Sequence, residues 1–86
     1  MSIGIDEFSG MDYVIYPNPS QTYFSISGLS DLSIVTVFDV TGKEVMRIEN
    51  YVSGQKIAVD DLSSGFYNVQ IQTGDKIVPL KLEVLR

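Results

Sequence analysis

The chemistry open to this sequence depends on its carboxylates, hydroxyls and lysines, because its 86 residues include no Cys, no His and no Trp. Disulfides, thiolate or imidazole metal sites, and Ser-His-Asp or Cys-His catalysis each lack a required residue. Asp60 and Asp61 are the obvious pair for glycosidase-like chemistry. Neighbours in an extended chain point to opposite faces, however, and cannot flank one bond without a special turn. The residues therefore predict no enzyme and no catalytic residue.

Three other patterns have ordinary structural interpretations. Asp39, Asp60, Asp61 and Asp75 could supply oxygens to calcium but lack the spacing of a calcium-binding loop, so we expect no metal and no other cofactor. A glycine-lysine pair at 42–43 is followed by a strand, as in a hairpin and not in a nucleotide loop. Five tyrosines could line a sugar-binding platform, although half-buried strand tyrosines are the more ordinary account: Tyr13, Tyr16, Tyr23, Tyr51 and Tyr67.

Charge and length exclude further classes. Eleven acidic against six basic residues give a net charge of −5, the wrong sign for binding nucleic acid or anionic membranes. A chain of this length buries one thin core without a deep cofactor cavity, so we expect no small-molecule substrate. The start of the chain, residues 1–12, has no export signal and reads as a linker.

The elements that position these residues are predicted to be strands. Helical periodicity is almost missing, while β-branched and aromatic runs recur about every 8 to 12 residues, which is typical of a sandwich. We expect an all-β fold with seven strands at 13–16, 22–27, 34–40, 44–49, 55–59, 67–72 and 76–84.

Alternation within these strands predicts the core. Leu62 should plug one open end of the sandwich, and a bulge near Met46-Arg47 should reconcile Val45 with Ile48, which are out of phase. The side chains expected to face inward are Phe24, Ile26, Ile57, Val59, Tyr67, Val69, Ile71, Val78, Leu80, Leu82 and Val84.

Pro79 places the last strand at a sheet edge or in a bulge, because proline cannot donate to a ladder. An edge strand can accept a partner strand, or a second copy of the chain by self-association. We therefore expect residues 78–86 to offer a free backbone edge.

Four pieces of sequence follow one another in order: Tyr16-Pro17-Asn18-Pro19, Phe38 to Val45, Leu62 to Val69, and a terminal strand with Lys81. Together they resemble the type A C-terminal sorting domain of the type IX (Por) secretion system. The resemblance covers about residues 13–86. Its motif positions, which the resemblance marks as sorting or recognition residues, are Pro17, Asn18, Pro19, Gly42, Lys43, Gly65, Tyr67 and Lys81. Most of them have structural roles in turns and packing, whereas Lys81 faces outward on the edge strand and is equally a candidate for receptor contact.

The resemblance implies an Ig-like β-sandwich at the end of a larger exported cargo of a Gram-negative bacterium. It further implies a route through the periplasm, passage across the outer membrane by the type IX translocon and its shuttle proteins, and a final place at the cell surface or in the medium. A sortase-like peptidase would remove the domain near its start, in the linker at 1–12. Two alternatives stay open: an Ig-like carbohydrate-binding module that uses Tyr23 and Tyr51, and a passive spacer domain.

Overall fold

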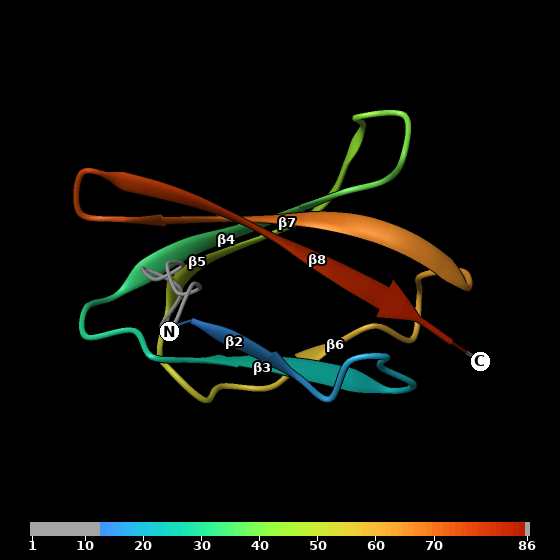
Figure 1. The fold of residues 1–86 in the computed structure, drawn as a ribbon, viewed down its shortest axis with the longest axis horizontal. Helices are drawn as coiled ribbons and strands as arrows, with labels where there is room; N and C mark the ends of the chain where they lie inside the picture. Colours follow the sequence, from blue (N-terminus) through green and yellow to red (C-terminus); the bar gives the residue numbers. More distant parts are fainter. Residues whose placement is uncertain (1–12, 86) are drawn as a thin grey trace, which may run out of the picture.

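Two antiparallel sheets pack face to face in the computed structural model, which describes residues 13–85 (Figure 1). Three strands form the smaller sheet in the order β2-β3-β6 and four form the larger in the order β5-β4-β7-β8. Their bounds are β2 Val14–Tyr16, β3 Tyr23–Ser27, β4 Ser33–Phe38, β5 Glu44–Tyr51, β6 Ile57–Ala58, β7 Gly65–Thr73 and β8 Lys76–Val84. This is the predicted all-β, Ig-like sandwich. β5, the fourth strand in chain order, pairs with β4, the third. Within the described residues no helix forms, and so none is long and apolar enough to cross a membrane.

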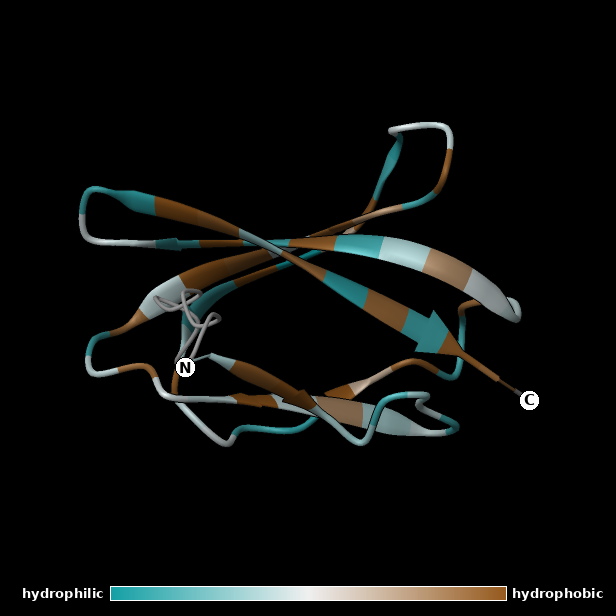
Figure 2. Ribbon diagram, in the orientation of Figure 1, coloured by the Kyte–Doolittle hydropathy of each residue, from teal (hydrophilic) through white to brown (hydrophobic). Residues whose placement is uncertain are grey.

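The core lies between the sheets and follows the predicted alternation. Alternate residues of β7 are buried, and hydrophobic and hydrophilic bands alternate along β7 and β8 in Figure 2. Leu62 is buried, as expected of a plug. The side chains with no exposed surface include Phe24, Ile26, Val35, Val37, Val59, Val69, Ile71 and Leu82. Val78 and Leu80 are only partly buried, against the edge of this core.

A register shift is found near Met46-Arg47, as predicted: Met46 pairs with Val37, but Phe38 pairs with Glu44, so Val45 is the extra residue. A second shift lies between Ser33 and Val35 of β4. The first shift lets Val45 and Met46, which are neighbours in sequence, both pack against the core. Simple alternation forbids that arrangement.

Every strand except β8 differs from its predicted bounds by about one or two residues at one or both ends. β4 stops at Phe38 because Asp39 begins a hydrogen-bonded turn, β5 continues to Tyr51, and β6 is reduced to Ile57–Ala58. These shifts move no predicted core residue to the surface.

β8 is an edge strand, as Pro79 predicted, and its pairing with β7 runs unbroken from Lys76 to Val84. Glu83 directs its backbone N–H and C=O away from β7, toward Asn18 and Ser20. Backbone groups of alternate residues point the same way, so Pro79 also faces the outer edge. Its missing N–H therefore removes no bond from the β7–β8 ladder, and no bulge is needed.

Candidate functional site

The turn after β2, residues 17–20, lies against the end of β8, and we call it the clamp. The Asn18 side chain replaces a neighbouring strand there: its Nδ2 donates to the Lys81 carbonyl at 3.1 Å, and its Oδ1 accepts from the Glu83 N–H at 3.0 Å. The clamp therefore joins two motif positions, Asn18 and Lys81, that lie far apart in the sequence. The clamp contains two cis peptide bonds, Tyr16-Pro17 and Asn18-Pro19.

Ser20 completes the clamp, and the sequence analysis missed it. Its N–H donates to the Glu83 carbonyl and its carbonyl accepts from the Leu85 N–H, both at 2.8 Å, in a parallel bridge to Val84. Its hydroxyl donates to the Pro17 carbonyl, and the residue is fully buried. The only sequence signal was a serine directly after two prolines, which is common in turns.

The clamp occupies the outer backbone edge of β8 from Lys81 to Leu85. The expectation of a free edge over residues 78–86 is therefore wrong for that part. Arg86 lies outside the described residues. Among residues 13–85, no hydrogen bond reaches the outer edge between Ile77 and Pro79, where one backbone donor is absent in any case. The part of the outer edge of β8 that stays without hydrogen bonds to residues 13–85 is therefore short and has few backbone donors.

The second motif, Gly42-Lys43, lies in the β4–β5 hairpin, which is fixed by one carboxylate. Oδ1 of Asp39 accepts from the Thr41 N–H at 2.9 Å, the Thr41 hydroxyl at 2.6 Å and the Lys43 N–H at 3.1 Å. The hydrogen bond from the Thr41 side chain, followed by that from the Lys43 backbone, lowers the pKa of Asp39 below its usual value of 3.8. Gly42 has a φ of 88°, which favours glycine. The hairpin presents Val40, whose surface is 76% exposed.

The third motif, Gly65-Phe66-Tyr67, begins β7. The Tyr67 ring is buried and its hydroxyl donates to the Ser63 carbonyl at 2.7 Å, so it holds the preceding loop against the strand. Phe66 points to the opposite face, where 63% of its surface is exposed. Gly65 has a φ of 153° and no heavy atom within 4 Å of the position that a Cβ would take, so backbone conformation and not space favours glycine.

All four motif regions meet at one end of the molecule. Phe38, Asn68 and Lys81 are direct neighbours across β4, β7 and β8. Tyr67 lines two surface hollows, one of about 370 Å³ shared with Lys81 and one of about 650 Å³ shared with Lys43. The clamp, the β4–β5 hairpin, the start of β7 and the end of β8 all lie on the side where the C-terminus is drawn (Figure 1).

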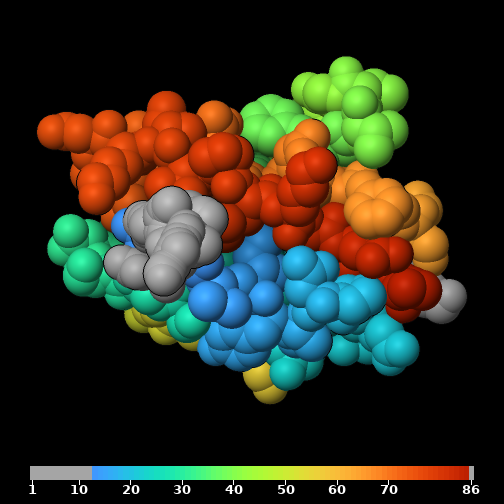
Figure 3. Space-filling model, in the orientation of Figure 1, coloured from blue at the N-terminus to red at the C-terminus, as the bar shows by residue number. Residues whose placement is uncertain are grey.

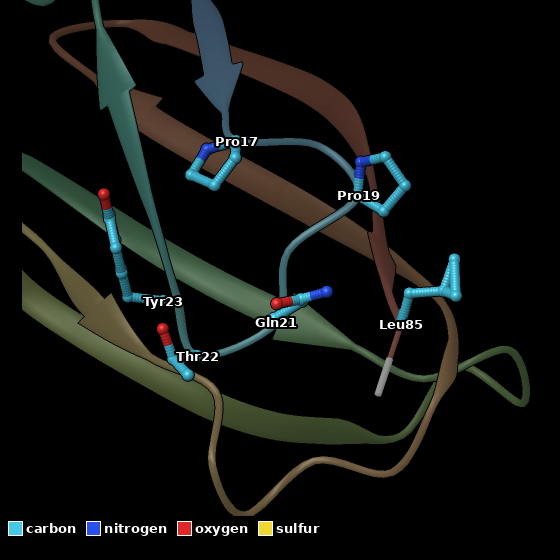
Figure 4. A pocket seen from close by; sticks show the side chains of 6 residues that line it. All are labelled: Pro17, Pro19, Gln21, Thr22, Tyr23 and Leu85. Atoms are coloured by element: carbon cyan, nitrogen blue, oxygen red, sulfur yellow. The ribbon is translucent and has the colours of Figure 1, made fainter.

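A separate open pocket of about 430 Å³ lies behind the clamp. Figure 4 shows Pro17 and Pro19 on the turn, with Leu85 of the chain end facing them. The full lining is Pro17, Pro19, Gln21, Thr22, Tyr23 and Leu85. It contains neither an acidic nor a basic side chain, and we assign it no chemistry.

The tyrosines do not form the platform required of a sugar-binding module. Tyr51 has no exposed surface, and its hydroxyl accepts from the Ile26 N–H at 2.7 Å and donates to the Gln55 carbonyl. Burial raises the pKa of this phenol above its usual value of 10.0. Tyr23 lies under the Lys56 ammonium, 4.7 Å from the ring centroid. The alternative of a carbohydrate-binding module that uses Tyr23 and Tyr51 therefore loses one of its two aromatic side chains, because Tyr51 is a core residue.

Within residues 13–85, no three acidic side chains gather into a group that could hold a metal ion. The described residues form a small β-sandwich whose motifs shape turns and one sheet edge. This places the chain in the class of small β-sandwich domains.

The comparison with protein families gives a more specific answer. The family model described as the secretion system C-terminal sorting domain matches residues 14–84, nearly the whole described chain. The chain belongs to this family, the C-terminal sorting domains of type IX secretion, which is a family of sorting signals and not of enzymes. A comparison with curated proteins gives no match.

Proposed function

We propose that this domain directs an attached cargo protein across the outer membrane through the type IX translocon and its shuttle proteins, and that a sortase-like peptidase then removes it. The observation that carries this proposal is the family match over residues 14–84. Membership implies a secreted or cell-surface precursor and contact with the secretion machinery. The route through the periplasm and the removal step follow from the resemblance.

The structure supports recognition of the domain as a folded unit. Its motif residues are spread from Pro17 to Lys81 along the sequence, and folding alone brings them to one end. An unfolded tail would present the same residues without a common surface. A cut within the linker at 1–12, which lies outside the described residues, would leave every described strand in place.

The test is the location of a fluorescent reporter that is exported to the periplasm and ends in residues 1–86. It should reach the surface or the medium in a bacterium with a working type IX system and stay in the periplasm of a strain without one. The reporter alone is one control. A reporter followed by the domain with Val69→Asp, which buries an unpaired charge in the core, is the other. Retention of the intact fusion in both strains would contradict the proposal.

Removal of the domain is tested in the same cells by the mass of the surface reporter. A loss of at most 9.5 kDa, the mass of residues 1–86, is expected in the competent strain, because the proposed cut lies within residues 1–12. A surface reporter of full length would contradict the proposed cleavage and leave the sorting role intact.

A further inference from the structure

The outer face of the four-stranded sheet carries an apolar surface that neither folding nor the clamp uses. We call it the outer patch and define it as Val40, Phe66, Asn68 and Lys81, which line the hollow of about 370 Å³ together with the buried Tyr67. Val40 and Phe66 are 76% and 63% exposed. In Figure 3 the green β4–β5 hairpin, the orange start of β7 and the red β8 border one region of the surface. Contiguous exposed apolar surface of this kind often marks a site of interaction.

The backbone that carries Val40, Phe66 and Lys81 is fixed by hydrogen bonds. Val40 is held by the three hydrogen bonds to Asp39, and Phe66 is followed by Tyr67, whose hydroxyl is bonded to Ser63. The backbone carbonyl of Lys81 accepts a hydrogen bond from the Asn18 side chain. A partner would therefore order little of this surface on binding, which lowers the cost of association.

The charge at the outer patch selects the partner. Arg47 and Glu49 form the one salt bridge within residues 13–85, so the Lys81 ammonium has no acidic partner there. It stands beside Val40 and Phe66, and Glu83, the neighbour of Phe66 across the strands on the same face, forms no salt bridge with Lys81. A cation bordered by apolar surface is complementary to a carboxylate that is itself bordered by apolar side chains.

The backbone edge of β8 is a poorer candidate for recognition. Asn18 and Ser20 already bind it from Lys81 to Leu85, and Pro79 offers no donor in the remaining part. A partner strand would have to displace four hydrogen bonds of the clamp. A partner can contact the side chains of the outer face without breaking any of these four hydrogen bonds.

We propose that the outer patch is the docking surface for a folded protein of the export machinery that presents a carboxylate within an apolar surface. This inference rests on the proposed function. Lys81 pairs with the carboxylate, while Phe66 and Val40 fill the apolar surroundings.

The test uses the reporter that ends in residues 1–86, in the competent strain, with each patch variant matched to a control that carries the same kind of substitution outside the patch. Lys81→Glu and Phe66→Ser should each slow export about tenfold, whereas Lys81→Arg should retain most of it. Lys76→Glu and Ile77→Ser are the controls, because they make the same changes at exposed positions of β8 outside the patch. Both controls should export within about twofold of the original. Thermal unfolding of each purified variant verifies that the fold is kept.

The outcomes separate the inference from the function on which it rests. If the unmodified reporter is exported and the patch variants match their controls, the docking surface is wrong and the sorting role stands. If the unmodified reporter is not exported, both are overturned. A photoreactive amino acid at position 66 should crosslink to a protein of the export machinery in competent cells. Lys81-dependent binding to vesicles of anionic phospholipid, without such a crosslink, would replace the protein partner with a membrane and overturn the proposal.

Discussion

The two halves of β8 pair with the same neighbour, β7, yet they differ in almost every other respect. The second half, from Lys81 onward, has its outer backbone bound by the clamp, and it supplies Leu82 and Val84 to the fully buried core. In the first half, Lys76–Leu80, the inward side chains are only partly buried. Pro79 removes one backbone N–H from its outer edge. Only the second half carries a motif residue, Lys81.

The two halves of β8 show two ways in which an edge strand is kept from pairing with another chain. A free edge is a template for aggregation. The outer backbone groups of the second half are hydrogen-bonded by the clamp, which comes from the opposite end of the sequence. The first half pairs poorly with another strand because Pro79 lacks a backbone N–H. The secured half is also the one beside the outer patch, so rigidity and exposed recognition chemistry coincide.

The largest expected effect compares core contacts of the two halves. Leu82→Ala should lower the free energy of unfolding by about 3 kcal/mol, because it leaves a cavity in the packed core. Leu80→Ala, in the less buried half, should cost about 1 kcal/mol. Urea unfolding of both variants measures the difference. Equal losses would show that the two halves do not differ in packing.

The next effect concerns the clamp. Asn18→Ala should lower the free energy of unfolding by about 1 kcal/mol, because it removes two exposed hydrogen bonds. Hydrogen exchange at the Glu83 amide should become faster, while the Leu80 amide, which points toward β7, keeps its protection. Asn68→Ala is the matched control, since that side chain makes no hydrogen bond with residues 13–85 and its change should stay within about 0.5 kcal/mol. Unchanged exchange at Glu83 would contradict the clamp.

Pro79→Ala tests the first half of β8, Lys76–Leu80. It restores an N–H at the outer edge, so stability should change by less than about 1 kcal/mol while self-association increases. Sedimentation velocity over a range of concentrations compares the variant with the original chain. A variant that stays monomeric at every concentration would show that proline is not what guards this edge.

The smallest effect concerns the β4–β5 hairpin, which lies at the same end of the molecule as the second half of β8, and it depends on pH. The pKa of Asp39 is lowered by its hydrogen bonds with Thr41 and Lys43, so their stabilising contribution is present above the usual value of 3.8 and is lost as pH falls through the lowered one. Amide shifts of Thr41 and Lys43 should therefore titrate with a midpoint below 3.8, while that of Gly54, which has no acidic neighbour in sequence, does not follow.

Asp39→Asn should abolish this titration. A midpoint at or above 3.8 in the original chain would contradict the assignment of these hydrogen bonds to the ionised carboxylate.

Much of the fold was predictable because it is encoded locally. The alternation of Tyr67, Val69 and Ile71 gave the inner face of β7, and Pro79 gave the edge position of β8. The irregularity near Met46-Arg47 was predictable because Val45 and Ile48 are out of phase. Alternation alone does not reveal that Val45 and Met46 both pack inward, which depends on the opposite sheet. The site was predictable only in part: its residues could be named from motifs, but their contacts could not.

The sequence by itself determined the seven strands, most of their faces and the family. Side-chain period and turn chemistry act over a few residues, and motif order survives in the linear chain. Only the tertiary structure decided that Asn18 binds the backbone of Lys81 and Glu83, that Ser20 closes the edge beside it, and that Tyr51 is a core residue. Backbone groups are the same at every residue, so a partner 63 positions away leaves no mark in the sequence until packing brings the two segments together.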